Sequence, residues 1–117
     1  EDGKYSQYLI QDSLYFHKRL FADYQRLGVE SLVIEVDNKI AGYTFGTKIS
    51  DDTFCILAEI ADLGKKGASQ FLFQKFCEQA RQFTYINTMD DSGLPALQKA
   101  KLSYHPHKIQ KIYHVFF

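Results

Sequence analysis

The sequence predicts an α+β domain built on a mixed sheet, with the elements in the order helix, strand, strand, strand, helix, strand, helix, strand. Two β-rich runs joined by turn residues predict an antiparallel hairpin. A strand that leads through a glycine-containing turn into a helix and then another strand predicts a parallel connection, with helices on the faces of the sheet. At 117 residues, the chain is long enough for one hydrophobic core, so residues 1–117 are predicted to form a single domain.

The first helix is predicted from Tyr5 to Leu27 because large apolar residues recur there at a helical spacing. Gly28 follows at the position of a C-terminal cap. Next, the β-rich runs 31–36 and 40–46 flank Asp37, Asn38 and Lys39, which are turn residues typical of a hairpin.

The middle of the chain is predicted as strand, glycine turn and helix. Thr53–Ala61 is β-rich, and the turn Asp62–Ala68 contains two glycines. The helix after this turn has one apolar face, made of Phe71, Leu72, Phe76, Cys77 and Ala80.

The last third is predicted as strand, helix, strand. Residues 83–88 form the first of these strands, and Asp91 or Ser92 can cap the helix that follows. Ile109–Phe117 alternates loosely and is predicted to close the sheet as a strand. The residues of the helix expected to face inward or along its flank are Leu94, Leu97, Ala100 and Lys101.

Composition limits the possible partners. Fourteen basic and fourteen acidic residues give no net charge, so contact with nucleic acid or anionic lipid requires a local patch, and we expect no DNA partner. No apolar run reaches the eighteen or so residues of a membrane span, which favours a cytoplasmic domain, although the parent protein can lie at the inner face of a membrane. Cys55 and Cys77 have no metal-site spacing and are expected to be reduced, buried thiols.

The glycine turn is the first candidate site. The start of a helix presents unpaired amide hydrogens and a partial positive charge, so this turn can hold a phosphate or pyrophosphate, helped by two lysines. The alternative is a plain strand-to-helix turn with solvated lysines. The residues concerned are Gly64, Lys65, Lys66, Gly67, Ala68 and Ser69.

The second candidate site is the segment from Tyr85 to Pro106. A strand that ends in Asn87 and is followed by Asp90 and Asp91 places polar groups where the carboxyl ends of strands often bind ligands. Either carboxylate can act as a base or orient an amine. The alternative assigns Asp91 to helix capping, Asn87 to a turn and Tyr104 to the core.

Several motifs in this order resemble the family of phosphatidylglycerol lysyltransferase C-terminal domains. The resemblance runs from about Gly28 to Tyr113 and includes the stretches IEVDNKIAGYTFG, AEIAD and KGASQ. Its most specific part is the spacing of Ile86, Asn87, Asp91, Gly93 and Leu97, followed by Lys99, Ala100, Lys101, Leu102, Ser103, Tyr104 and Pro106.

The resemblance implies a tandem of two folds of the GNAT type, the acyl-CoA N-acyltransferase fold, of which this chain is the second. The first is an N-terminal GNAT-like half of the same parent chain. The family's best-understood members are similar to peptidoglycan-bridge aminoacyltransferases and move an aminoacyl group from aminoacyl-tRNA to a lipid head group. The GNAT fold also implies acyl-CoA as a possible donor. The residues implied are Asp91, Lys101 and Tyr104 for catalysis, Asn87 and Asp90 for the acceptor, and Gly64, Lys66, Gly67, Ala68 and Ser69 for the donor.

The chain departs from these patterns at five positions, one of which is Lys99, the nearest match to a Tyr that often protonates the departing thiolate in GNAT enzymes. Gly64 stands where GNAT acetyltransferases have Gln or Arg, and Thr88, Met89 and Gln98 replace residues that include two potential anion-binding arginines. These departures favour an alternative in which the chain is a non-catalytic GNAT-like module that binds or supports its other half.

The last part of the sequence contains two weaker signals. Lys101, Lys108 and Lys111, with Tyr104 and Tyr113, can form a basic aromatic surface for RNA, or an ordinary sheet edge. His105 and His107 flank Pro106, but the sequence places no third ligand nearby, so no metal site is predicted.

Overall fold

The computed structural model describes residues 2–90, 94–113 and 115, with the side chains of residues 2–6 and 9 excepted. The chain divides into two compact units, Glu1–Asn87 and Thr88–Phe117, which are described separately. The first unit contains α1 (Asp2–Leu27), β1 (Glu30–Val36), β2 (Lys39–Lys48), β3 (Thr53–Ala61), α2 (Ala68–Gln79) and β4 (Tyr85–Asn87), and the second contains α3 (Pro95–Leu102). The prediction of one domain over residues 1–117 stays a prediction.

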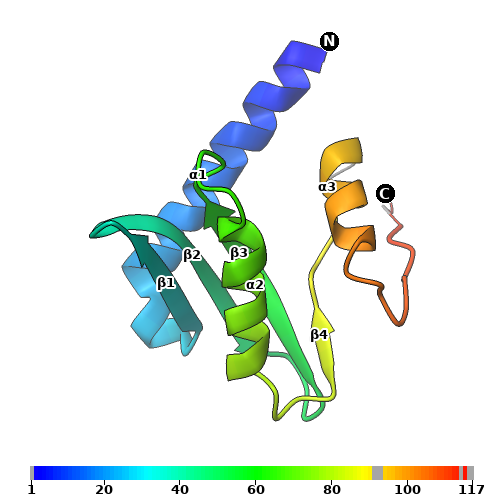
Figure 1. Ribbon diagram of the computed structural model, residues 1–117. Helices are drawn as coiled ribbons and strands as arrows, with labels where there is room; N and C mark the ends of the chain where they lie inside the picture. The colour runs from blue at the N-terminus through cyan, green and yellow to red at the C-terminus, as the bar shows by residue number, and fades with distance from the viewer. Residues whose placement is uncertain (1, 91–93, 114, 116–117) are drawn as a thin grey trace. The chain divides into compact units, whose positions relative to one another are not determined.

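The four strands form one mixed sheet in the order β1-β2-β3-β4 (Figure 1). β1, β2 and β3 pair antiparallel, and β4 pairs parallel to β3. The predicted hairpin is confirmed, since Val36 pairs with Lys39 across a two-residue turn. Asp37 and Asn38 both have positive φ angles, 54° and 63°, the geometry of the type I′ turns that join twisted strands. The predicted α+β class with a mixed sheet is therefore confirmed.

The helix α2 covers one face of the sheet, in front of the strands in Figure 1. Its fully buried Leu72 packs with Ile34 and Ala41, and its Phe76 packs with Phe54 and Ile56. Burial of these apolar side chains is the main term that holds the helix on the sheet.

The helix α1 covers the opposite face (Figure 1). Its Leu20 is buried against Phe45 and Ala58, and the ring of Phe21 lies edge-on to Tyr43 and Phe45 at 5.0 and 5.1 Å between centroids. His17 Nδ1 lies 2.6 Å from Tyr43 Oη, a hydrogen bond between α1 and β2. Burial lowers the pKa of His17, so the neutral imidazole is favoured in this contact.

A β-bulge in β3 shifts which of its side chains face each helix. Phe45 pairs with Ala58 but Gly46 pairs with Ile56, so Leu57 is an extra residue in β3. In an uninterrupted strand Ile56 and Ala58 would face the same side. Here Ile56 packs with α2 and Ala58 packs with α1.

The second unit differs from the sequence prediction in two respects. Residues 109–113 and 115 form no strand, so the predicted closing strand is wrong over the described part of Ile109–Phe117. Their apolar side chains form no buried face, since Ile109, Ile112, Tyr113 and Val115 stay 65–77% exposed. The helix forms where predicted, and none of its residues is fully buried, so of the expected inward or flank positions for Leu94, Leu97, Ala100 and Lys101 the inward one is not seen. The predicted caps Asp91 and Ser92 lie outside the described residues.

Replacing Leu72 by Ala is expected to lower the free energy of unfolding by about 2–5 kcal/mol, because the cavity left between α2 and the sheet cannot fully close. Urea-induced unfolding followed by circular dichroism measures this loss. Leu63→Ala is the matched control, since Leu63 is 95% exposed, and it is expected to change stability by less than about 0.5 kcal/mol. Equal losses for both variants would contradict the packing of α2 described above.

Candidate functional site

The turn between β3 and α2 is shaped by Asp62. The Asp62 N–H donates to the carbonyl of Ala41 at 2.8 Å, which fixes the start of the turn to β2. The carboxylate of Asp62 accepts the N–H of Gly64 at 2.9 Å, and its carbonyl accepts the N–H of Lys65 at 3.1 Å. Asp62 therefore folds the chain back toward the sheet through local hydrogen bonds of the Asx-turn type.

The start of α2 follows this turn without a side-chain cap. Gly67 occupies the N-cap position with φ 81°, a left-handed conformation that favours glycine. The N–H of Ala68 donates to the Lys65 carbonyl at 3.1 Å, and the N–H of Phe71 donates to the Gly67 carbonyl at 2.9 Å. The amides of Ser69 and Gln70 belong to the first helical turn, which has no intrahelical acceptors.

The residues predicted for the donor site therefore come together in this turn. Lys65 and Lys66 are exposed, Ala68 is buried, and Ser69 is half-buried. An open cavity of about 470 Å³ lies beside them, bounded on its other side by the end of β1. It is lined by Ile34, Glu35, Val36, Gly64, Lys65, Lys66, Gly67, Ala68 and Phe71.

β4 pairs only with the first three residues of β3. Thr53, Phe54 and Cys55 pair with Tyr85, Ile86 and Asn87, and β4 ends there. β3 continues for six more residues, from Ile56 to Ala61, so its edge extends beyond the end of β4. The bulge at Leu57 lies in this extended part.

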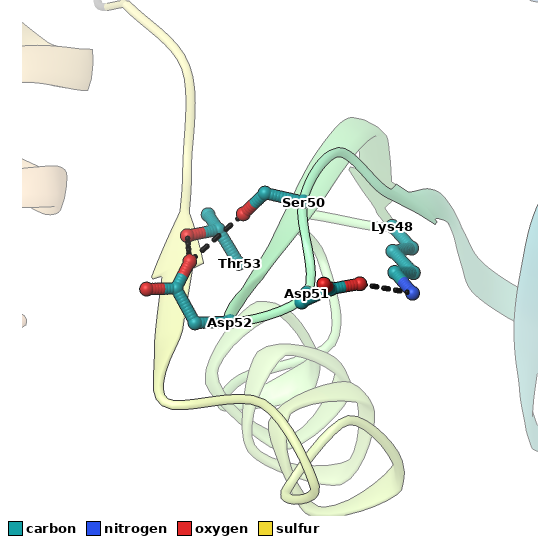
Figure 2. A network of polar contacts seen from close by, with 5 residues as sticks. All are labelled: Lys48, Ser50, Asp51, Asp52 and Thr53. Atoms are coloured by element: carbon teal, nitrogen blue, oxygen red, sulfur yellow. Dashed lines mark hydrogen bonds and ion pairs between the residues drawn. The ribbon is translucent and has the colours of Figure 1, made fainter.

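The turn between β2 and β3 holds the paired part of β3 and β4 in place (Figure 2). Ser50 Oγ and Thr53 Oγ1 each donate to Asp52 Oδ1 at 2.8 Å, and these bonds lower the pKa of Asp52, that from Thr53 most. The Asp52 carbonyl accepts the N–H of Tyr85 at 2.9 Å, which ties β4 to the turn. Lys48 Nζ lies 2.9 Å from Asp51 Oδ1, a surface ion pair that adds little stability.

Sequence reasoning missed Glu59, which lies in the extended part of β3. Its side chain is half-buried, with Oε2 fully buried. The pKa of the Cys77 thiol on α2 is raised, first by burial and then by the negative charge of Glu59, which places the two side chains near each other. A charged residue within the apolar run FCILAEIA was the available signal. Of the two cysteines, Cys55 is buried as predicted but Cys77 is only half-buried, and they form no disulfide with each other.

The second unit contains most of the other predicted site residues. Lys101 Nζ donates to the carbonyls of Thr88 and Asp90, so its ammonium group holds the segment that follows β4. The side chain of Asp90 is exposed, and Tyr104 is half-buried. Asn87 belongs to the first unit, where it is exposed at the end of β4. Asp91, predicted as catalytic, lies outside the described residues.

Within the described residues, no group of three or more His, Cys, Asp or Glu side chains is arranged to hold a metal ion. A search of the same residues finds no helix with the length and apolar character needed to cross a membrane.

Comparison with known protein families identifies the family of the chain. Residues 8–116 match the family described as phosphatidylglycerol lysyltransferase, C-terminal. The chain belongs to this family. No curated protein sequence matches it.

Solved structures give the same answer for the fold. A conserved protein of unknown function from Bacteroides thetaiotaomicron is 35% identical, with a TM-score of 0.75, over 78% of this chain. This chain spans only 31% of that protein's length.

Two acetyltransferases share the fold at low identity. A ribosomal-protein-alanine N-acetyltransferase from Brucella melitensis is 12% identical, with a TM-score of 0.62, over 76% of this chain and 71% of its own. The aminoglycoside N-acetyltransferase AAC(6')-Iy, solved in complex with CoA, is 9% identical, with a TM-score of 0.60, over 91% of this chain and 89% of its own. The predicted GNAT-like fold is thus confirmed.

Replacing Glu59 by Gln is expected to lower the pKa of Cys77, because it removes a negative charge that disfavours the thiolate. Alkylation of Cys77 by iodoacetamide at about pH 8 should then be several-fold faster than in the wild type, since the thiolate is the reactive form. Mass spectrometry of the Cys77 peptide measures the rate. Glu78→Gln is the control, because Glu78 is next to Cys77 in sequence but exposed. An equal acceleration in both variants would refute the proximity of Glu59 and Cys77.

Replacing Lys101 by Met keeps an aliphatic stem but removes the donors to Thr88 and Asp90. Amide hydrogen exchange of residues 88–90 and 95–104 is expected to become about tenfold faster, while that of β2 and β3 stays unchanged. Lys99→Met is the matched control on the same helix, because Lys99 is exposed. If the two variants exchange alike, Lys101 does not hold this segment.

Proposed function

We propose that this chain is the transferase domain of a GNAT-like enzyme that moves an acyl or aminoacyl group to an amine or hydroxyl acceptor. One observation carries the proposal. The edge of β3 that extends beyond β4 runs directly into the turn Asp62–Gly67 and the uncapped start of α2. A strand edge and a helix start of the kind that can bind phosphate therefore adjoin along one continuous segment.

The donor site is proposed at this segment. Both acyl-CoA and aminoacyl-tRNA carry phosphates, which the amides at the start of α2 can bind, with Lys65 and Lys66 adding positive charge. The extended edge of β3 can pair with a donor arm that carries amide groups, as the pantetheine of CoA does. The CoA bound to the acetyltransferase AAC(6')-Iy supports acyl-CoA as one possible donor.

The transfer step requires an acceptor that loses a proton, an oxyanion that is stabilised and a leaving group that gains a proton. We assign these tasks to Asp91, Lys101 and Tyr104. The ammonium of Lys101 already donates to two carbonyls, which favours a positioning or electrostatic role over proton abstraction. Asn87 and Asp90 are proposed to bind the acceptor, since both are exposed polar residues at or after the end of β4.

The family supports a proposal for the acceptor and for the partner. The family's description names phosphatidylglycerol lysyltransferase, which supports an aminoacyl donor and a lipid head group as acceptor. It also names a C-terminal part, so an N-terminal GNAT-like half is proposed to complete the site in the parent protein. The reaction is proposed to take place in the cytoplasm, at the inner face of a membrane when the acceptor is a lipid.

The second candidate is a non-catalytic GNAT-like module that binds or supports the other half of its parent. Two observations favour it. Position 64 is Gly, so no long polar side chain from that position reaches a donor phosphate. The ammonium of Lys101 is engaged with the backbone of its own unit.

Binding of acyl-CoA and of aminoacyl-tRNA to the purified parent protein tests the proposal. Gly67→Ala is expected to weaken donor binding about tenfold, or about 1.4 kcal/mol, because it disturbs the turn that presents the amides of α2. Gly28→Ala is the matched control, since Gly28 also has a positive φ, 66° against 81°, and at both positions an added Cβ meets nothing within 4 Å. Both variants should lose similar stability. A parent that binds neither donor at about millimolar concentration would favour the non-catalytic module.

A further inference from the structure

The first part of α1 carries apolar side chains that no described residue of the first unit covers. Every described side chain from residue 7 to residue 16 is exposed, although this stretch includes several large apolar residues. Asp2–Phe16 makes up fifteen residues of the helix, about 22 Å at 1.5 Å per residue. Figure 1 shows this blue half of α1 running past the end of the strands.

Two of these residues continue the stripe that packs on the sheet. Ile10, Leu14, His17 and Phe21 follow one another at spacings of four, three and four residues, which places them on one side of the helix. His17 and Phe21 contact Tyr43 of β2. Ile10 and Leu14 lie further along the same stripe and are 60% and 55% exposed. The sheet-facing side of α1 is therefore longer than the sheet face it covers.

Tyr8 and Tyr15 form a separate pair on the other side of the helix. They are seven residues apart and 69% and 65% exposed. They do not continue any contact with the sheet, so they provide an internal comparison for the stripe.

We propose that Ile10 and Leu14 form a docking surface for the N-terminal portion of the parent chain. The matched family is described as a C-terminal part. This chain covers 31% of the protein that is 35% identical, so the unmatched rest of that protein is more than twice as long as the matched part. An apolar surface of the parent packed against Ile10 and Leu14 would extend the contact that α1 already makes with Tyr43. This inference rests on the tandem organisation in the proposed function, but not on catalysis.

Thiol labelling of the full-length parent tests the contact. Four variants each place one cysteine in α1: Ile10→Cys, Leu14→Cys, Tyr8→Cys and Tyr15→Cys. Iodoacetamide is expected to label positions 10 and 14 at least about tenfold more slowly than positions 8 and 15 in the folded parent, because a covered thiol reacts only when the contact opens. Mass spectrometry of each peptide separates these thiols from Cys55 and Cys77, and all four should react alike in denaturant.

Three outcomes would overturn the proposal. Similar rates at all four positions would show that nothing covers the stripe, and equal protection at all four would show that the contact is not specific to it. Protection that disappears on dilution of the parent would identify a second copy as the occupant. Because the labelling needs no substrate, an inactive parent with protected positions 10 and 14 would contradict the proposed function and leave this inference intact.

Discussion

The pairing of β2 with β3 is the interaction on which the rest of the first unit depends. The extra residue Leu57 changes the side to which β3 presents its side chains, so that Ile56 packs with α2 and Ala58 with α1. The backbone of β2 must also approach its neighbours closely at Gly46, where a Cβ would lie 2.5 Å from the ring of Phe54. The bulge thus decides which apolar side chains of β3 belong to the core under each helix.

The strand β3 also positions the candidate donor site. β4 is tied to the turn before β3 through the carbonyl of Asp52, and it ends after three paired residues. β3 continues beyond it and passes directly into the turn shaped by Asp62. The geometry that supports a donor site is therefore a consequence of unequal strand lengths, combined with a helix start that no side chain caps.

Elements whose signal is local were predicted well. The β3 strand has the predicted bounds Thr53–Ala61, and Asp37 and Asn38 form the predicted turn, because turn chemistry and β-rich runs act over a few residues. The segment from residue 109 was predicted wrongly, since loose alternation of apolar residues does not provide a neighbouring strand to pair with. The glycine turn was found from its residue types, whereas the Glu59 carboxylate near Cys77 was not, because that proximity joins a strand to a helix.

By itself, the sequence determined the fold class, the hairpin, the glycine turn and the family, because each depends on residue type and spacing along the chain. Only the tertiary structure decided which side chains face which helix, since the bulge at Leu57 shifts the alternation that a sequence pattern assumes. It also decided that Lys101 binds the carbonyls of Thr88 and Asp90, and that Ile10 and Leu14 extend past the sheet. These features depend on distances between residues far apart in the chain, which spacing does not encode.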